Sequence, residues 1–271
     1  MDLKDKIIII TGASSGIGRS LAFEFAKRGA NLILAARQYV TLCEITETLV
    51  NQYPIKAVAV QCDVTSQEEC EHLIKQTLTI FGKIDVLVNN AGISMRGLFM
   101  NTDVEVLKKV MDVNFWGTVY CTKHALPEIL KTKGTIVGVS SIAGYKGLPG
   151  RSGYSSSKFA MNGFLDVLRL ENLHTGVNVL TACPGFTTSN IRSNSLDKEG
   201  KQQGESSMDE DKMMSSEQVA IIIADGVERR ARTLIMTGQG KLMVFLNKIV
   251  PGLVDKLVYN TIAKEKNSLL K

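Results

Sequence analysis

Tyr154 and Lys158 are the pair of residues whose types and spacing most directly suggest proton chemistry. Side chains four positions apart on a helix lie on one face, so the phenol and the ammonium would be neighbours. A phenol has a reference pKa of about 10, and a nearby positive charge lowers the pKa of a phenol by stabilising the phenolate. The pair therefore predicts a tyrosine that exchanges a proton near neutral pH.

Ser141 and Asn114 are two further polar residues of the predicted catalytic group; Asn114 belongs to it only through the family resemblance given below. Ser141 precedes Tyr154 by thirteen positions, and its hydroxyl would stabilise an oxygen on which negative charge develops. Each residue also has a simpler explanation: a Tyr-x3-Lys pair is common on exposed helices, a serine ends many strands and an asparagine caps many helices. The catalytic interpretation depends on all four occurring together.

A glycine-rich turn near the start of the sequence is typical of dinucleotide binding. Residues 11–18 read Thr-Gly-Ala-Ser-Ser-Gly-Ile-Gly and follow an apolar run. Glycine lets the backbone approach a pyrophosphate, and a helix that begins there offers free N–H groups. The residues predicted to contact the cofactor are Gly12, Ser14, Ser15, Gly16, Ile17 and Gly18. An ordinary tight turn is the alternative, and the position between an apolar run and a helix favours a cofactor.

Arg37 indicates which dinucleotide binds. A site that prefers NAD usually has an acid at the end of the second strand, where this sequence has Ala35-Ala36-Arg37. A guanidinium forms charge-assisted hydrogen bonds with a 2′-phosphate, and the Ser14 hydroxyl would assist. We therefore predict NADP(H), the alternative being that Arg37 is a solvated surface charge.

Seven apolar runs alternate with segments long enough for helices, which start at signals such as Ser66, Asp103 and Ser215. Continuous aliphatic runs are typical of strands buried on both faces. The predicted strands cover residues 6–11, 31–36, 57–61, 84–88, 135–139, 177–182 and 233–236. We predict an α/β fold over residues 1–271, a single doubly wound (Rossmann) domain with a seven-stranded, mostly parallel sheet and helices on both faces.

Two segments differ from this pattern. Residues 186–214 are polar and are interpreted as a substrate lid, the alternative being a solvated excursion without a role. Residues 240–271 form an amphipathic helical tail with interspersed lysines. Such a tail would lie on an anionic membrane surface or cover the entrance to an apolar pocket, and the alternative is packing on the sheet or on a second subunit.

Composition excludes several classes of protein. The chain of 271 residues is 44% hydrophobic and 22% charged with a net charge of +5, which is typical of a globular protein. Five dispersed cysteines without a CxxC pair argue against a disulfide framework and a zinc site, and three scattered histidines add no metal centre. No signal peptide or transmembrane span is expected, so we predict a cytoplasmic protein, with membrane contact limited to the tail. Nucleic-acid binding is not expected, because the tail has few aromatic residues.

Several motifs in order resemble those of the short-chain dehydrogenase/reductase family. They are the TGxxxGxG turn at 11–18, Asn89-Asn90-Ala91-Gly92, Asn114, Ser141, Tyr154-x3-Lys158 and Pro184-Gly185. The resemblance runs from Lys4 to about Ser189. Residues 89–97, 138–158 and 184–190 further resemble the branch that contains 11β-hydroxysteroid dehydrogenases and reductases of lipid-like ketones.

This resemblance implies further roles for residues around the site. Lys158 would also hydrogen-bond the nicotinamide ribose, and Asn114 would anchor a water that links Lys158 to solvent. The implied cofactor contacts are Asp63 and Val64 at the adenine, Asn90, Ala91 and Gly92 at the adenosine ribose, and Pro184, Gly185, Thr187 and Ser189 at the carboxamide. Many relatives have threonine at the position of Ser189, so that contact departs from the family pattern. Relatives form dimers or tetramers, so a homodimer or homotetramer is expected.

These observations predict an NADP(H)-dependent oxidoreductase. It would interconvert a ketone or aldehyde and an alcohol by hydride transfer, with a fairly hydrophobic small molecule as substrate. The alternative is a sensor or scaffold that binds NADP(H) without turnover, and the intact Ser141, Tyr154 and Lys158 favour the enzyme.

Overall fold

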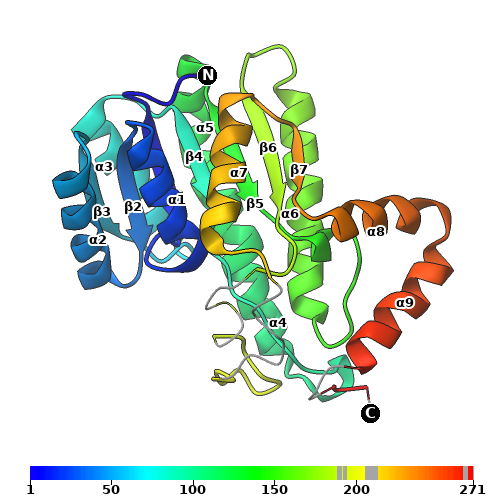
Figure 1. Cartoon of the computed structure of the whole chain (residues 1–271). Helices are drawn as coiled ribbons and strands as arrows, with labels where there is room; N and C mark the ends of the chain where they lie inside the picture. Colours follow the sequence, from blue (N-terminus) through cyan, green and yellow to red (C-terminus); the bar gives the residue numbers. More distant parts are fainter. Residues whose placement is uncertain (188–190, 192–193, 205–212, 265–267, 271) are drawn as a thin grey trace.

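One parallel sheet forms the centre of the molecule (Figure 1). The computed structural model describes residues 1–187, 191, 194–204, 213–264 and 268–270. The strands, in the spatial order β3-β2-β1-β4-β5-β6-β7, are β1 (Ile7–Thr11), β2 (Asn31–Ala36), β3 (Ala57–Gln61), β4 (Val86–Asn89), β5 (Thr135–Val139), β6 (Asn178–Cys183) and β7 (Thr233–Ile235). Every pair of neighbouring strands is parallel, so the predicted fold class is confirmed.

Helices cover both faces of the sheet. They are α1 (Gly16–Lys27), α2 (Tyr39–Gln52), α3 (Gln67–Phe81), α4 (Val104–Met111), α5 (Gly117–Thr132), α6 (Ser152–Glu171), α7 (Ser216–Glu228), α8 (Gly238–Ile249) and α9 (Pro251–Ala263). Apolar side chains of α1, α2 and α7 join one buried cluster, and those of α3, α5 and α6 join the cluster on the opposite face.

Strand β1 shows why its sequence is aliphatic without polar alternation. Ile8 and Ile10 belong to the first cluster, and Ile9 between them belongs to the second. Successive side chains of a strand point to opposite faces, so a strand covered on both faces buries every residue.

The helix-start signals at Ser66 and Ser215 form caps. Ser66 Oγ accepts from the backbone N–H of Glu69 at 3.1 Å, and Ser215 forms a capping box with Gln218. Asp103 precedes α4 as expected, but the long helix predicted after it is interrupted. A π-helical turn, η2 (Asp112–Trp116), separates α4 from α5.

The chain order creates a topological switch point at the carboxyl ends of the strands. The chain adds β2 and β3 on one side of β1 and then returns to place β4 on the other side. Loops after the carboxyl ends of β1 and β4 therefore lead in opposite directions, and ligands of doubly wound folds bind where they separate. The glycine turn follows β1, and Asn90-Ala91-Gly92 follows β4.

Helices α8 and α9 form a C-terminal arm, residues 238–263, that projects away from the sheet (Figure 1). Large apolar side chains of the arm are exposed: Leu242, Phe245, Ile249, Val250, Leu253, Leu257 and Tyr259. These seven side chains do not pack on the sheet, whereas Val244 and Val254 of the arm are buried. Among the described residues, no helix is both long enough and apolar enough to span a membrane.

Candidate active site

The glycine turn brings the start of α1 close to the segment that follows β4. Gly12 has a φ of +65°, and a Cβ on Gly18 would lie 2.2 Å from the carbonyl oxygen of Gly12 and 2.5 Å from Asn90 Nδ2. Both distances are shorter than a van der Waals contact, so residue 18 must be glycine for α1 to start here. The Ser15 side chain at the N-cap of α1 makes no capping hydrogen bond within the described part of the chain. N–H groups at the start of a helix that lacks such a cap can bind an anion.

Asn90 connects the two loops by hydrogen bonds. Its Nδ2 donates to the carbonyl oxygens of Thr11 (2.9 Å) and Gly12 (3.2 Å). Thr11 Oγ1 accepts from the backbone N–H groups of Asn90 (3.0 Å) and Ala91 (3.1 Å). Asn90 and Thr11 thus hold the shape of the turn, and Thr11, the first residue of the motif, is a site residue that was not predicted from the sequence.

Arg37 lies beside the glycine turn with most of its side chain exposed. The guanidinium is 4.0 Å from the carboxylate of Asp63, which also accepts from the N–H (3.0 Å) and hydroxyl (2.9 Å) of Thr65. Ser14 Oγ donates to Gln38 Oε1 at 3.0 Å. Gln38, which follows Arg37 in the chain, thus connects Ser14 to the end of β2, and no sequence motif singles it out. Val64 packs against Gly117 at the start of α5.

The π-helical turn positions Asn114. The Asn114 amide pairs with the backbone of Ile93, donating to its carbonyl oxygen at 3.0 Å and accepting from its N–H at 2.8 Å. Asn114 Nδ2 also donates to Ser157 Oγ (2.9 Å), which in turn donates to the carbonyl oxygen of Tyr154 (2.8 Å). Asn114 thus links the segment after β4 to α6, the helix that carries Tyr154 and Lys158. Ser157 is a second residue that the sequence-based analysis missed.

Lys158 is buried and faces Tyr154. Its ammonium donates to the carbonyl oxygen of Val139 at 2.9 Å and lies 5.8 Å from the centre of the Tyr154 ring. Burial lowers the pKa of Lys158 to about 8, because the charged form loses hydration. A Cβ on Gly92 would lie 3.2 Å from Asn114 Oδ1 and 3.6 Å from Lys158 Nζ. The fold therefore brings together the four predicted positions 92, 114, 154 and 158.

Ser141 lies where β5 ends, and its hydroxyl oxygen accepts from the backbone N–H of Ala143 at 3.1 Å. This contact uses a lone pair and leaves the O–H hydrogen as a donor. Tyr154 packs against a small apolar cluster that is separate from the two main clusters. The buried members of this cluster are Met95, Val106, Val110 and Leu196. A phenol, an ammonium and a hydroxyl beside an apolar surface form a site suited to proton transfer at a polar group of an apolar molecule.

The segment after β6 lies beside Ser141. The backbone N–H of Ile142 donates to the carbonyl oxygen of Pro184 at 3.3 Å, and Thr187 Oγ1 donates to that of Gly185 at 3.2 Å. Ser189 lies outside the described residues, as does part of the predicted lid. In the described part of residues 186–214, Leu196 forms a β-bridge with Met95 and packs in the apolar cluster at Tyr154.

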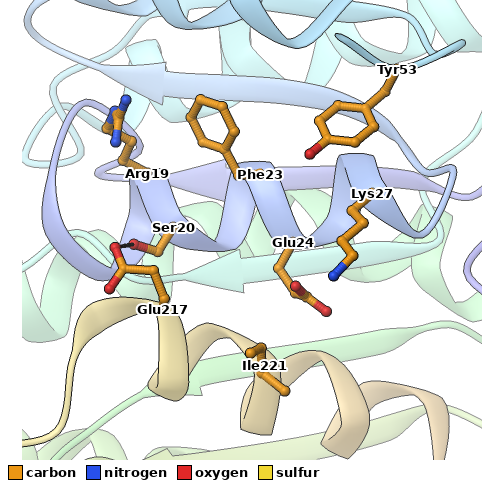
Figure 2. Close-up of a pocket in the computed structure, with 8 residues that line it drawn as sticks. All are labelled: Arg19, Ser20, Phe23, Glu24, Lys27, Tyr53, Glu217 and Ile221. Atoms are coloured by element: carbon orange, nitrogen blue, oxygen red, sulfur yellow. Dashed lines mark hydrogen bonds between the residues drawn. The ribbon is translucent and has the colours of Figure 1, made fainter.

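A separate hollow of about 290 Å³ lies on the outer side of α1, between α1 and α7 (Figure 2). Ser20 Oγ donates to Glu217 Oε1 across it at 3.2 Å. The four predicted catalytic residues do not line this hollow. Among the residues that the structure describes, no group of three or more His, Cys, Asp or Glu side chains is arranged to hold a metal ion.

Two curated relatives share substantial identity with the chain. It is 39% identical over 237 residues to the 11-beta-hydroxysteroid dehydrogenase A of Sesamum indicum, covering 86% of this chain and 66% of that protein. It is 32% identical over 271 residues to the dehydrogenase/reductase SDR family member 7B of Mus musculus, covering 98% of this chain and 84% of that protein. The chain thus spans slightly less than two thirds of the sesame protein.

Solved structures show the same fold. An alcohol dehydrogenase from the archaeon Thermococcus sibiricus, complexed with 5-hydroxy-NADP, has a TM-score of 0.78 and 25% identity, with 86% of this chain and 96% of that chain covered. A short chain dehydrogenase/reductase from Burkholderia phymatum, in complex with NAD, has a TM-score of 0.83 and 22% identity, with 93% and 96% covered. Residues 6–200 match the family profile described as short chain dehydrogenase. The chain belongs to the short-chain dehydrogenase/reductase family of oxidoreductases.

Proposed function

We propose that this protein is an NADP(H)-dependent oxidoreductase that interconverts a hydrophobic ketone or aldehyde and the corresponding alcohol. The buried Lys158 ammonium beside the Tyr154 ring, with Ser141 at the neighbouring strand end, is the observation that carries the proposal. The apolar cluster at Tyr154 supports a hydrophobic substrate. Relatives named as hydroxysteroid dehydrogenases support the same substrate class.

The residues around the switch point between β1 and β4 fit a dinucleotide with a 2′-phosphate. The uncapped start of α1 would bind the pyrophosphate, and the exposed guanidinium of Arg37 would bind the 2′-phosphate. Asp63 and Val64 would flank the adenine, Asn90 to Gly92 would lie beside the adenosine ribose, and Pro184 to Thr187 would contact the carboxamide. When bound, the nicotinamide supplies or accepts the hydride.

The side chains around Tyr154 would manage the proton and the developing charge. During reduction, Tyr154 donates its phenolic proton to the substrate oxygen, and the nearby Lys158 ammonium stabilises the phenolate that remains. Ser141 donates its O–H to the same oxygen as negative charge develops there. Asn114 and Ser157 fix the backbone of α6 relative to the segment after β4, so the distance between these groups is held constant.

Oxidation of NADPH in the presence of a panel of carbonyl compounds tests this function. Aliphatic, steroid-like and acyl-chain ketones should be compared with small polar ketones, and we expect turnover to favour the apolar compounds. Saturable NADPH binding without turnover of any ketone, aldehyde or alcohol in either direction would favour the alternative, a sensor or scaffold that binds NADP(H).

Replacing Arg37 by aspartate tests the choice of cofactor. A carboxylate repels a 2′-phosphate and accepts hydrogen bonds from ribose hydroxyls, so affinity for NADPH should fall by on the order of 10- to 100-fold while affinity for NADH rises. Titration of both cofactors into wild type and Arg37→Asp by intrinsic fluorescence measures this. Arg232→Asp, at an exposed arginine after α7, serves as the control for a general change in charge. The same ratio of the Kd for NADPH to the Kd for NADH in wild type and in Arg37→Asp would contradict the role of Arg37.

The pKa of Lys158 predicts a pH dependence. Below a pKa of about 8 the side chain is charged and stabilises the phenolate, and above it the proton is lost. The kcat/KM for ketone reduction should therefore decrease as the pH rises through about 8. Measurement of kcat/KM at saturating NADPH over about pH 6 to 10, a range that brackets this pKa, tests the prediction. Lys158→Met should show low activity and no such decrease in kcat/KM. A wild-type kcat/KM that stays constant through pH 8 would contradict the prediction.

We propose two further contacts for this protein, self-association and peripheral membrane binding. Exposed Phe159, Val167 and Leu170 on α6 support a homodimer or homotetramer, which light scattering would measure as a multiple of the chain mass.

The exposed apolar side chains of the C-terminal arm, interspersed with Lys241, Lys248 and Lys256, support contact of an otherwise cytoplasmic protein with an anionic membrane. Failure to sediment with vesicles rich in phosphatidylserine would contradict the membrane contact.

A further inference from the structure

The C-terminal arm begins beside the catalytic serine. A Cβ on Gly240, in the first turn of α8, would lie 2.3 Å from Ile142 Cδ1, so the helix rests on the residue that follows Ser141. A Cβ on Gly185 would lie 2.7 Å from Cγ2 of Thr237, the residue whose Oγ1 caps the same helix by accepting from the Gly240 N–H at 3.0 Å. The base of the arm is thus packed between the loops after β5 and β6. The arm then projects outward and turns into α9 (Figure 1).

Lys146 attaches both helices of the arm to the loop of residues 145–151. Its ammonium donates to Asn247 Oδ1 of α8 at 2.9 Å and pairs with the carboxylate of Asp255 of α9. Asn247 Nδ2 donates back to the carbonyl oxygen of Tyr145 at 3.2 Å. The Lys146 side chain is only 12% exposed although it is charged, and this burial favours the paired arrangement. One lysine therefore joins the loop to α8 and to α9.

The loop that Lys146 holds connects Ser141 to Tyr154 along the chain. It follows η3 (Ile142–Gly144), which starts after Ser141, and it leads into α6, which carries Tyr154. Its other side contacts the segment that lines the apolar cluster. The Gly97 N–H donates to the carbonyl oxygen of Gly150 at 2.9 Å, and Arg151 Nη1 donates to Ser94 Oγ at 2.9 Å.

The chain after the arm returns to the same loop. Leu269 Cδ1 lies 2.8 Å from the position of a Cβ on Gly150, which has a φ of +72°. An apolar side chain from the end of the sequence thus covers the loop at the point where it meets Gly97. The arm and the segment after it contact the outer side of the loop that borders the apolar surface at Tyr154.

We infer that Lys146 is a positioning residue through which the C-terminal arm holds the 145–151 loop as the outer wall of the substrate site. The inference rests on the proposed function for the identity of that site as a carbonyl site. A small ketone contacts the groups at Ser141 and Tyr154 without reaching the outer wall. A long-chain or polycyclic ketone extends to the wall, so its binding depends on the position of the loop.

Replacing Lys146 by methionine keeps an unbranched side chain, one heavy atom shorter, and removes its charge and hydrogen bonds. The KM for a polycyclic or long-chain ketone should rise roughly 5- to 10-fold, about the net effect of losing one ordinary hydrogen bond, because Lys146 acts on the site only through the loop; kcat should stay nearly unchanged. The kinetic constants for a small ketone such as cyclohexanone, and the Kd for NADPH, should stay at the wild-type values. Lys146→Arg retains a cation with several donors and should restore most of the KM.

Hydrogen–deuterium exchange followed by mass spectrometry gives a readout that needs no turnover. Lys146→Met should exchange faster than wild type in both the 145–151 loop and α8–α9, because the contacts that join them are lost. Lys248→Met is the matched control, since Lys248 is an exposed lysine that follows Asn247 on the same helix. Asp255→Asn changes a side chain that is 65% exposed, so the variant should fold. It should raise the KM for large ketones and the exchange rates to a smaller extent than Lys146→Met.

The outcomes separate this inference from the proposed function. Equal loss of kcat/KM for small and large ketones, or unchanged exchange in Lys146→Met, would overturn the role of Lys146. If wild type reduces no carbonyl compound, the proposed function fails, and the exchange data alone decide whether Lys146 couples the arm to the loop. Faster exchange in the arm but not in the loop would also overturn the inference.

Discussion

Replacing Tyr154 by phenylalanine is expected to lower kcat for ketone reduction by about 10²–10⁴-fold, the usual contribution of a general acid. The change removes one oxygen and leaves the ring, which packs beside the apolar cluster and lies 5.8 Å from the Lys158 ammonium. The Kd for NADPH should therefore stay at the wild-type value. Steady-state assays give kcat, and fluorescence titration gives the Kd on the same preparation.

A matched change elsewhere controls for the loss of a phenol. Tyr53→Phe removes a hydroxyl at the end of α2, beside the outer hollow (Figure 2), and should keep normal kcat. Normal turnover in Tyr154→Phe would refute the assignment of Tyr154 as the proton donor. A large loss of NADPH affinity in that variant would show instead that the hydroxyl serves mainly in cofactor binding.

The second large effect is expected from Gly18→Ala. The added methyl would lie 2.2 Å from the carbonyl oxygen of Gly12 and 2.5 Å from Asn90 Nδ2, so α1 must move away from the loop after β4. Overpacking of this kind costs about 1–3 kcal/mol of the free energy of unfolding. The displaced turn also misdirects the N–H groups at the start of α1, so NADPH affinity should fall more than stability alone explains.

Gly163→Ala is the matched control for this change. Gly163 lies inside α6, and no heavy atom lies within 4 Å of the position of its Cβ among the described residues. Alanine there should raise the free energy of unfolding by about 0.5–1 kcal/mol, because glycine weakens a helix interior. Thermal denaturation and NADPH titration compare the two variants. A Gly18→Ala protein with wild-type Tm and Kd would contradict the close approach of α1 to Asn90.

Much of the sheet could be predicted because both of its faces are buried. Continuous aliphatic runs gave three strands, 31–36, 57–61 and 135–139, with the bounds found in the structure, and the others within two residues. Residues such as Ser66 act locally, so the start of α3 was also predictable. An aliphatic run and a helix cap each depend on residues close together in the sequence, so both can be predicted from one segment alone.

The contacts that organise the candidate site depend on segments far apart in the sequence. The hydrogen bonds from Asn114 to Ile93 and from Asn90 to Thr11 join residues that only the folded sheet brings together. Their partners are backbone groups, which every residue possesses, so no residue type identified them. The apolar periodicity of the arm likewise predicted helices without showing that their apolar side chains are exposed.

The π-helical turn between α4 and α5 makes the network around Asn114 sensitive to the number of residues in the chain as well as to their types. It contains one residue more per turn than a regular helix, and each residue of an α-helix rotates the chain by about 100°. Deletion of Val113 alone would merge the two helices and rotate the Asn114 amide away from Ile93, even though every polar residue is retained. Insertions and deletions in this stretch are therefore expected to be tolerated far less than substitutions of its exposed side chains.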